Sequence, residues 1–250
     1  MTIEPDSSTP IPPDNGLTPL LAKVALIPIQ VTVGDHSWQL TVVPDQAVFF
    51  EVYDAFEDPP HGFLLWESAI GLARFLDQQP RWVRGKRVLE LGAGVGLPGL
   101  VAQQLGAEVW QTDHQSDLLA LTTLNGRQNG DPPIQRFLAD WRRWTHVERY
   151  PLILGADILY DRALHFYLEH IFHRNLEPGG RLLLADPGRV QALEFMVRLE
   201  EHGWRVDLET LTVPEVAMQT VATAAGAEVQ NRTVEVTLYS CTRTLPGQRT

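Results

Sequence analysis

The chain has 250 residues, of which 44 % are hydrophobic, and a formal net charge of −11. This length fits one large domain with additions, and the negative charge argues against a large nucleic-acid surface, because phosphate contacts need clustered Lys and Arg. Since no apolar run is long enough to cross a bilayer, the first residues lack a signal-peptide pattern and Cys241 is the one cysteine, we expect a cytoplasmic protein without membrane segments or disulfides.

The first part of the chain predicts a flexible leader followed by a β-hairpin. Residues 1–20 hold five prolines together with Ser, Thr and Asp, a composition typical of disordered segments. The runs ALIPIQVTV and WQLTVVPD are rich in β-branched residues and are joined by a short polar turn, which predicts a hairpin. AVFFEVYDAF is interpreted as a further strand or a packing segment. We therefore expect a leader over 1–20, a hairpin extension over 21–58 and the main domain over 59–245.

The middle of the chain alternates between helical and strand patterns. Apolar residues from Phe63 to Leu76 recur at helical spacing and predict an amphipathic helix. A βαβ unit is expected next, with a strand at Arg87–Leu91, a glycine loop, a helix at about Leu97–Leu105 and a strand at Glu108–Thr112. The elements expected after this unit are a helix at Ser116–Asn125, strands at Gln135–Leu138 and Pro151–Leu154, a helix at Ala163–Asn175 stopped by EPGG, a strand at RLLLAD and a helix at Val190–His202.

The end of the chain changes character. WRVDLETLTV and TVEVTLYSC are strand patterns with no helix between them, so they should pair antiparallel. Alternating strands and helices followed by such a pair predict an α/β fold. We expect a Rossmann-like, doubly wound, seven-stranded sheet with an antiparallel C-terminal strand pair, preceded by the N-terminal hairpin.

The glycine loop VLELGAGVGLPG lies where a strand should pass into a helix. Gly92, Gly94 and Gly96 have the spacing G-x-G-x-G, whereas the dinucleotide fingerprint needs a glycine at position 97, which is Leu97. Glu90 lies two residues before the first glycine, and a carboxylate there suits a positively charged ligand group such as the ammonium of S-adenosylmethionine. The loop can also be a packing turn without a ligand.

Acidic and aromatic residues follow the next two predicted strands. Asp113 lies 21 positions after Gly92 and can accept hydrogen bonds from both ribose hydroxyls of a bound nucleoside, or can instead cap the following helix. A dinucleotide would need the same carboxylate, so Asp113 does not separate the two cofactor classes. Asp140 can accept a bond from an adenine amino group, and Trp141 can either stack on the adenine or lie on the surface rim.

These motifs resemble a known family. VLELGAGVGLPG, TDHQ, LADW and GADILYD are similar to the seven-β-strand methyltransferases that use S-adenosylmethionine. GFLLWESAIGLARFL, LADW and D-x-x-Y resemble the protein-lysine methyltransferases of methyltransferase family 16. ADPGR resembles the branch that contains electron-transfer-flavoprotein β-subunit lysine methyltransferase and its bacterial relatives. The resemblance covers about 59–204, and neither the hairpin nor the 214–232 segment has a counterpart in it.

The resemblance implies a lysine-methylating enzyme that binds S-adenosylmethionine and a protein substrate presenting a lysine. The positions that it assigns to the cofactor are Trp66, Gly92, Ala93, Gly94, Asp113, Asp140, Trp141 and Ala156. Asp157 and Tyr160 are implied to face the methyl acceptor. Asp157 would accept an N–H bond from the amine and aim its lone pair at the methyl group, while Tyr160 would supply an apolar wall or a hydroxyl acceptor.

Several alternatives stay open on the sequence. The same scaffold could methylate a nitrogen or oxygen of a small molecule, and an NAD-dependent oxidoreductase or a non-catalytic binding module are more remote possibilities. Asp186 and Arg189 either belong to the functional edge or build a DPG turn. His170 and His173 lie three apart without a third ligand, so no metal site is expected. Asp161 is expected to cap the helix that follows it.

Overall fold

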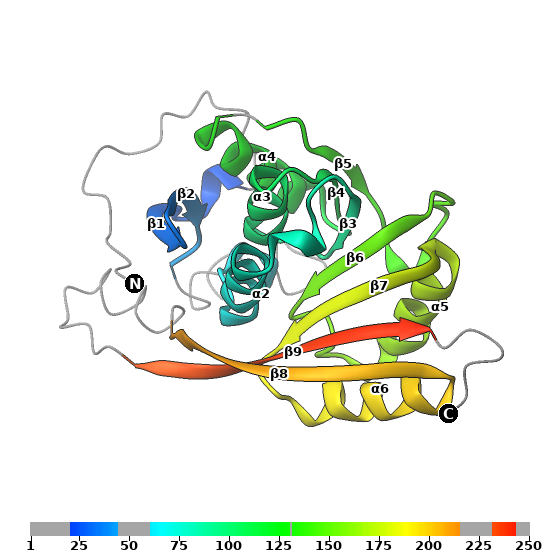
Figure 1. Ribbon diagram of the computed structural model, residues 1–250. Coiled ribbons are helices and arrows are strands. Elements are labelled where there is room, and N and C mark those ends of the chain that lie inside the picture. Colours follow the sequence, from blue (N-terminus) through cyan, green and yellow to red (C-terminus); the bar gives the residue numbers. More distant parts are fainter. Residues whose placement is uncertain (1–20, 45–60, 131, 216–231, 244–250) are drawn as a thin grey trace.

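The computed structural model describes residues 21–44, 61–130, 132–215 and 232–243 (Figure 1). The predicted leader and AVFFEVYDAF lie outside these residues, as does most of the 214–232 segment. Among the described residues, no helix combines the length and apolar character needed to span a membrane.

A seven-stranded sheet forms the centre of the molecule. Its strands are β3 (Arg87–Leu91), β4 (Glu108–Asp113), β5 (Gln135–Leu138), β6 (Tyr150–Ala156), β7 (Leu176–Asp186), β8 (Trp204–Pro214) and β9 (Thr233–Arg243). They lie in the order β5-β4-β3-β6-β7-β9-β8. The first five strands pair parallel, and β9 runs antiparallel to both of its neighbours. The predicted Rossmann-like sheet with an antiparallel C-terminal pair is confirmed.

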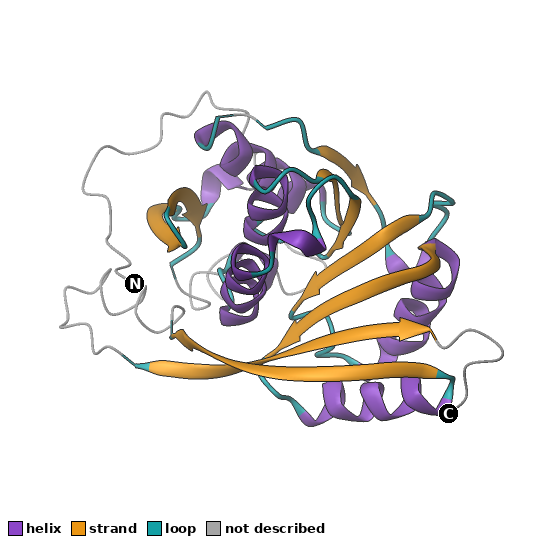
Figure 2. Cartoon of the chain, viewed as in Figure 1, coloured by secondary structure: helices purple, strands orange, loops and turns teal. Residues whose placement is uncertain are grey.

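Helices cover both faces of this sheet (Figure 2). One face carries α2 (Glu67–Gln78), α3 (Leu97–Gln104) and α4 (Ser116–Gln128), and the other carries α5 (His165–Asn175) and α6 (Val190–Glu201). Because successive side chains of a strand point to opposite faces, Val88 joins the core under α2, α3 and α4, while Leu89 joins the core under α5 and α6. Two apolar layers therefore enclose the sheet, as expected for parallel strands.

The two largest differences from the predicted element boundaries lie at the start of α2 and the start of β7. The helix expected to begin near Phe63 begins at Glu67, because the preceding Trp66 has extended backbone angles and forms the N-cap. The EPGG segment was expected to separate helix from strand, but β7 already begins at Leu176. The pairing of β6 with β7 shifts register between Tyr150 and Leu152, and this irregularity accommodates the residues before Arg181.

The N-terminal hairpin is confirmed as a separate two-stranded sheet. Its strands, β1 (Ile27–Val33) and β2 (His36–Val42), pair antiparallel around a two-residue turn in which Gly34 has a φ of 57°. The inward side chains of both strands are buried, and they belong to the same core as α2, α3 and α4. The hairpin therefore packs as part of the domain core.

Asn125 of α4 and Asn129, the C-cap residue of that helix, take the place of a neighbouring strand along β2. The amide of Asn125 accepts from Thr41 N–H (2.7 Å) and donates to Thr41 C=O (3.2 Å). Asn129 makes the same pair with Gln39, at 3.0 and 2.6 Å. Four residues of helix rise about 6 Å and two residues of strand about 6.8 Å, so the two spacings match. The exposed edge of β2 is thereby satisfied.

Candidate active site

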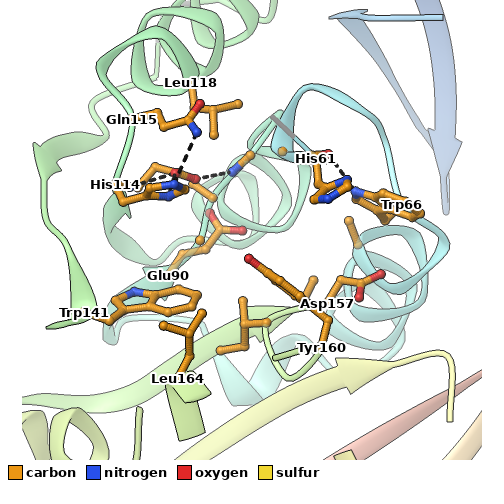
Figure 3. A pocket seen from close by; sticks show the side chains of 18 of the residues that line it. His61, Trp66, Glu90, His114, Gln115, Leu118, Trp141, Asp157, Tyr160 and Leu164 are labelled. Carbon is orange, nitrogen blue, oxygen red and sulfur yellow. Dashed lines mark hydrogen bonds and ion pairs between the residues drawn. The ribbon is translucent and has the colours of Figure 1, made fainter. Parts of the chain in front are cut away.

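A cavity of about 440 Å³ lies at the carboxyl ends of β3, β4 and β6. Its lining includes all eleven residues predicted for the site, which are Trp66, Glu90, Gly92, Ala93, Gly94, Asp113, Asp140, Trp141, Ala156, Asp157 and Tyr160. Figure 3 shows Trp141 and His114 on one side of this space and Trp66, Asp157 and Tyr160 on the other. The structure therefore brings the predicted residues together, while their individual roles stay predictions.

The glycine loop follows β3 and lines one wall of the cavity. Gly92 and Gly94 have φ angles of 63° and 52°, a left-handed conformation that glycine adopts without steric cost. A Cβ on Gly94 would lie 2.9 Å from the carbonyl oxygen of Gly62, and a Cβ on Gly92 would lie 2.9 Å from Ile158 and 3.2 Å from Trp141. Neither position has room for a side chain, and the loop backbone lines the cavity there.

Asp113 ends β4 and ties this strand to the glycine loop. Its side chain is 5 % exposed. One carboxylate oxygen accepts the Gly94 N–H at 3.1 Å, and the other accepts the His114 N–H at 2.7 Å. The alternative role as cap of α4 is wrong, because the N-cap is Gln115, which makes no side-chain capping bond. Asp113 instead presents its carboxylate at the cavity wall.

Glu90 is the most deeply buried acid of the cavity lining, at 2 % exposure. It accepts a hydrogen bond from Gln111 Nε2 at 2.7 Å, and Gln111 in turn accepts one from Arg136 at 3.1 Å. Burial raises the pKa of Glu90 to about 7. A carboxyl group in this state ionises readily when a cation is bound beside it, because the cation favours the charged form.

Asp140 and Trp141 follow β5. Asp140 accepts from the N–H of Arg142 at 2.9 Å and from its Nε at 3.0 Å, and so caps the short turn Trp141–Arg143. Part of its acceptor capacity is therefore used within the chain. The Trp141 ring forms the cavity wall beside Gly92. On the opposite wall, Trp66 donates from Nε1 to the carbonyl oxygen of His61 at 2.8 Å, which fixes its ring (Figure 3).

Asp157 lies immediately after β6 and is already paired. Its φ of 60° is the one positive value among the described non-glycine residues, and its N–H donates to the carbonyl of Ala185 at 2.8 Å. Its carboxylate, 9 % exposed, forms a salt bridge with Arg189. Burial raises the pKa of Asp157, and the charge of Arg189 opposes this rise. The sequence pointed to Asp157 but not to its partner.

Asp186 and Arg189 satisfy both interpretations that the sequence left open. Asp186 accepts the N–H of Arg189 at 2.7 Å, which builds the DPG turn after β7. The Arg189 side chain also lines the cavity. The capping role of Asp161 is confirmed, because it accepts the Ala163 N–H at 2.8 Å in the turn Arg162–Leu164 that precedes α5. Tyr160, 43 % exposed, lies edge-on to His61, and both line the cavity.

Sequence reasoning also missed further residues that line the cavity. His61 comes from the short helix His61–Phe63, and its pKa is lowered by burial and by the charge of Arg189. His114 and Gln115 lie between β4 and α4, and Leu118 lies in the first turn of α4 (Figure 3). His114 and Gln115 directly follow the strand-ending Asp113, and this position was the available signal.

Comparisons with known proteins point in one direction. A family model described as lysine methyltransferase matches residues 54–202. The electron transfer flavoprotein beta subunit lysine methyltransferase of Mus musculus is 30 % identical over 64 % of this chain and 62 % of its own length. The protein N-lysine methyltransferase METTL21A of Danio rerio is 32 % identical over 64 % and 73 %. The aligned region thus spans about three fifths of the mouse protein.

Solved structures with the same fold are more distant in sequence. The precorrin 8W decarboxylase of Methanobacterium thermoautotrophicum superposes with a TM-score of 0.55 at 17 % identity, over 76 % of this chain and 97 % of that one. The ribosomal protein L11 methylase of Lactobacillus delbrueckii gives a TM-score of 0.53 at 18 % identity, over 73 % and 81 %. At this identity the likeness concerns the fold.

Proposed function

The chain belongs to the lysine methyltransferase family, and we propose that it transfers the methyl group of S-adenosylmethionine to a lysine side chain of a protein. The observation that carries this proposal is that one cavity is lined by the glycine loop, by the acids that follow the strands and by the buried carboxylate of Asp157. The relatives named as lysine methyltransferases of proteins support the choice of acceptor.

The residues of the cavity fit S-adenosylmethionine. Its volume falls within the usual range for small-ligand sites, about 300–1,000 Å³. Gly92 and Gly94 line the cavity with backbone at positions where a Cβ would press on Ile158 or the Gly62 carbonyl oxygen, and Asp113 offers a carboxylate for ribose hydroxyls. The residues proposed to hold the cofactor are Trp66, Glu90, Gly92, Ala93 and Gly94 at the methionine part, Asp113 at the ribose, Asp140 and Trp141 at the adenine, and Ala156 beside the sulfonium.

The protein must supply a neutral amine in the correct orientation, because the bound cofactor provides an electrophilic methyl group on its sulfonium. A lysine with a pKa near 10.4 is neutral in only about one molecule in a thousand at neutral pH. Burial and a nearby positive charge both lower that pKa. We propose that Asp157 accepts an N–H bond from the amine and aims its lone pair, and that Tyr160 walls the acceptor channel.

Radiolabelled methyl transfer into a cell lysate, followed by mass spectrometry of the labelled bands, tests this function. We expect wild-type protein to label lysines of one or a few proteins. Asp157→Ala should abolish labelling while calorimetry still detects binding of S-adenosylhomocysteine. Label confined to small molecules would support an N- or O-methyltransferase for metabolites instead. Binding of NAD in place of S-adenosylhomocysteine would refute the cofactor assignment.

We also propose that the enzyme works in the cytoplasm on protein partners and not on nucleic acids or membranes. The net charge of −11 disfavours phosphate surfaces, and Cys241 is fully buried as a free thiol. Fractionation of cells that express a tagged chain tests the location, and recovery with the membrane pellet would contradict it.

A further inference from the structure

The guanidinium of Arg189 joins two carboxylates at the acceptor end of the cavity. Its Nη1 forms salt bridges with Asp157, which follows β6, and with Asp186 at the end of β7, the latter at 3.0 Å. The side chain of Arg189 is 29 % exposed, whereas Asp157 and Asp186 are 9 % and 0 % exposed. Arg189 and Asp157 therefore both face the cavity, while Asp186 is fully buried and does not line it.

Other charged and titratable groups surround Asp157. Asp186 and Glu67, the first residue of α2, both raise the pKa of Asp157 by like-charge repulsion, in addition to burial. Arg189 is the group that lowers it. On the neighbouring elements, the pKa of His61 is lowered by burial and by Arg189, and burial together with Asp186 raises the pKa of Tyr239 on β9. Arg189 thus supplies the positive charge in a predominantly acidic and neutral cluster.

We propose that Arg189 is a positioning residue for methyl transfer, which holds the ionised Asp157 carboxylate in place beside the acceptor amine. The positive charge of Arg189 also prevents Asp157 from stabilising the acceptor as an ammonium ion. This inference rests on the proposed function. An unshielded carboxylate beside a lysine stabilises the charged amine, which has no lone pair to donate. A carboxylate shared with a guanidinium still accepts an N–H bond but attracts a cation much less, so the amine enters in its reactive form.

The bond changes agree with this arrangement. The ammonium first loses its proton to solvent, the nitrogen lone pair then forms the N–C bond, and the S–C electron pair stays on sulfur. Positive charge therefore disappears from sulfur and appears on nitrogen. The Asp157 oxygen that accepts the N–H bond meets this developing charge in the transition state, where stabilisation accelerates the reaction.

The first test follows Asp157 itself and needs no methyl acceptor. Carboxyl carbons of ¹³C-labelled protein are titrated by NMR in the presence of S-adenosylhomocysteine, and Asp157 is assigned with Asp157→Asn. In Arg189→Gln we expect the Asp157 midpoint to rise by about one pH unit or more, because a buried acid loses its cationic partner. Arg189→Lys should restore most of the wild-type value. Arg205→Gln, which removes an exposed arginine paired with Asp207, should leave the midpoint unchanged.

The second test measures methyl incorporation from radiolabelled S-adenosylmethionine into lysate proteins between pH 6 and 9.5. We expect the acidic limb of the rate profile to move about one pH unit higher in Arg189→Gln and to return towards wild type in Arg189→Lys. Affinity for S-adenosylhomocysteine should stay unchanged in both variants.

The two tests fail in different ways. The role of Arg189 would be overturned if Asp157 titrated in Arg189→Gln as it does in the wild type. It would also be overturned if Arg189→Gln lost rate by the same factor at every pH and unfolded at a lower midpoint, because Arg189 would then only stabilise the structure. Absence of labelled lysine with wild-type protein would overturn the proposed function, and the NMR titration would still report whether Arg189 controls Asp157.

Discussion

Asn125 on α4 connects the hairpin to the glycine loop, and its removal should weaken both. Its side chain is fully buried. The amide accepts from Thr41 N–H at 2.7 Å and donates to Thr41 C=O at 3.2 Å and to Val95 C=O at 2.9 Å. Asn125→Ala therefore leaves one backbone donor and two backbone acceptors without these bonds, all in a part of the core closed to water.

The size of the effect follows from these three bonds. Each contributes about 1 kcal/mol, and a buried polar group left without a partner costs about 1–3 kcal/mol. We expect Asn125→Ala to lower the free energy of unfolding by about 3–5 kcal/mol, which for a chain of this length corresponds to a fall in melting temperature of about 10 °C. Since Val95 belongs to the glycine loop, affinity for S-adenosylhomocysteine should fall as well.

Urea unfolding and calorimetry check this expectation against a matched variant. Asn129→Ala removes the equivalent amide one turn later, but Asn129 is only partly buried, so water can replace its bonds to Gln39. We expect a loss of about 1 kcal/mol and unchanged cofactor affinity. If the two variants lose the same small amount of stability, the hydrogen-bond argument for the hairpin edge is wrong.

Three further substitutions test the cavity. Gly94→Ala places a Cβ 2.9 Å from the Gly62 carbonyl oxygen and should weaken S-adenosylhomocysteine binding about tenfold or more, whereas Gly85→Ala, which meets open space at a similar φ, should not. In the folded protein the pKa of Glu90 is about 7, raised from 4.5. Because the folded protein holds this proton more tightly than the unfolded chain does, the group stabilises the fold fully below pH 4.5, and this stabilisation is lost as pH rises through 7. Glu90→Gln should therefore remove about 3 kcal/mol from the pH dependence of the free energy of unfolding, measured in urea titrations. Trp141→Ala removes an aromatic wall and should weaken binding about tenfold with little change in unfolding.

For each of these substitutions, one outcome would contradict the reasoning behind the prediction. Equal weakening by Gly94→Ala and Gly85→Ala would show that backbone strain, and not contact with Gly62, controls the loop. If the free energy of unfolding of Glu90→Gln still depended on pH as in the wild type, a group other than Glu90 would be responsible for that dependence. If Trp141→Ala bound S-adenosylhomocysteine with wild-type affinity, the adenine would not lie against Trp141.

The fold and the cofactor side of the cavity could be predicted because their signals are local in sequence. The strand Arg87–Leu91 was predicted with its observed bounds, since its aliphatic residues lie between the polar GKR segment and the glycine loop. Gly92 directly follows β3, Asp113 is the last residue of β4, and Trp141 lies three residues after the end of β5. In parallel sheets these ends meet at one edge, so finding the strands is enough to bring the residues together.

The contacts that the sequence did not reveal join residues far apart along the chain. Arg189 lies 32 positions after Asp157, and the pair forms only because β6 and β7 are neighbours in the sheet. Asn125 lies 84 positions after Thr41, and an asparagine within a helix suggests a surface position when it is considered alone. Periodicity reports which face of an element is apolar, but it does not report which polar group lies opposite.

The backbone at Asp157 couples the position of its carboxylate to that of the glycine loop. A left-handed conformation at a non-glycine residue costs about 1–2 kcal/mol, and the bonds to Ala185 and Arg189 offset this cost. The sharp turn directs the carboxylate to Arg189 and returns Ile158 against Gly92 of the glycine loop. Because one turn sets both contacts, the carboxylate of Asp157 cannot move without disturbing the glycine loop.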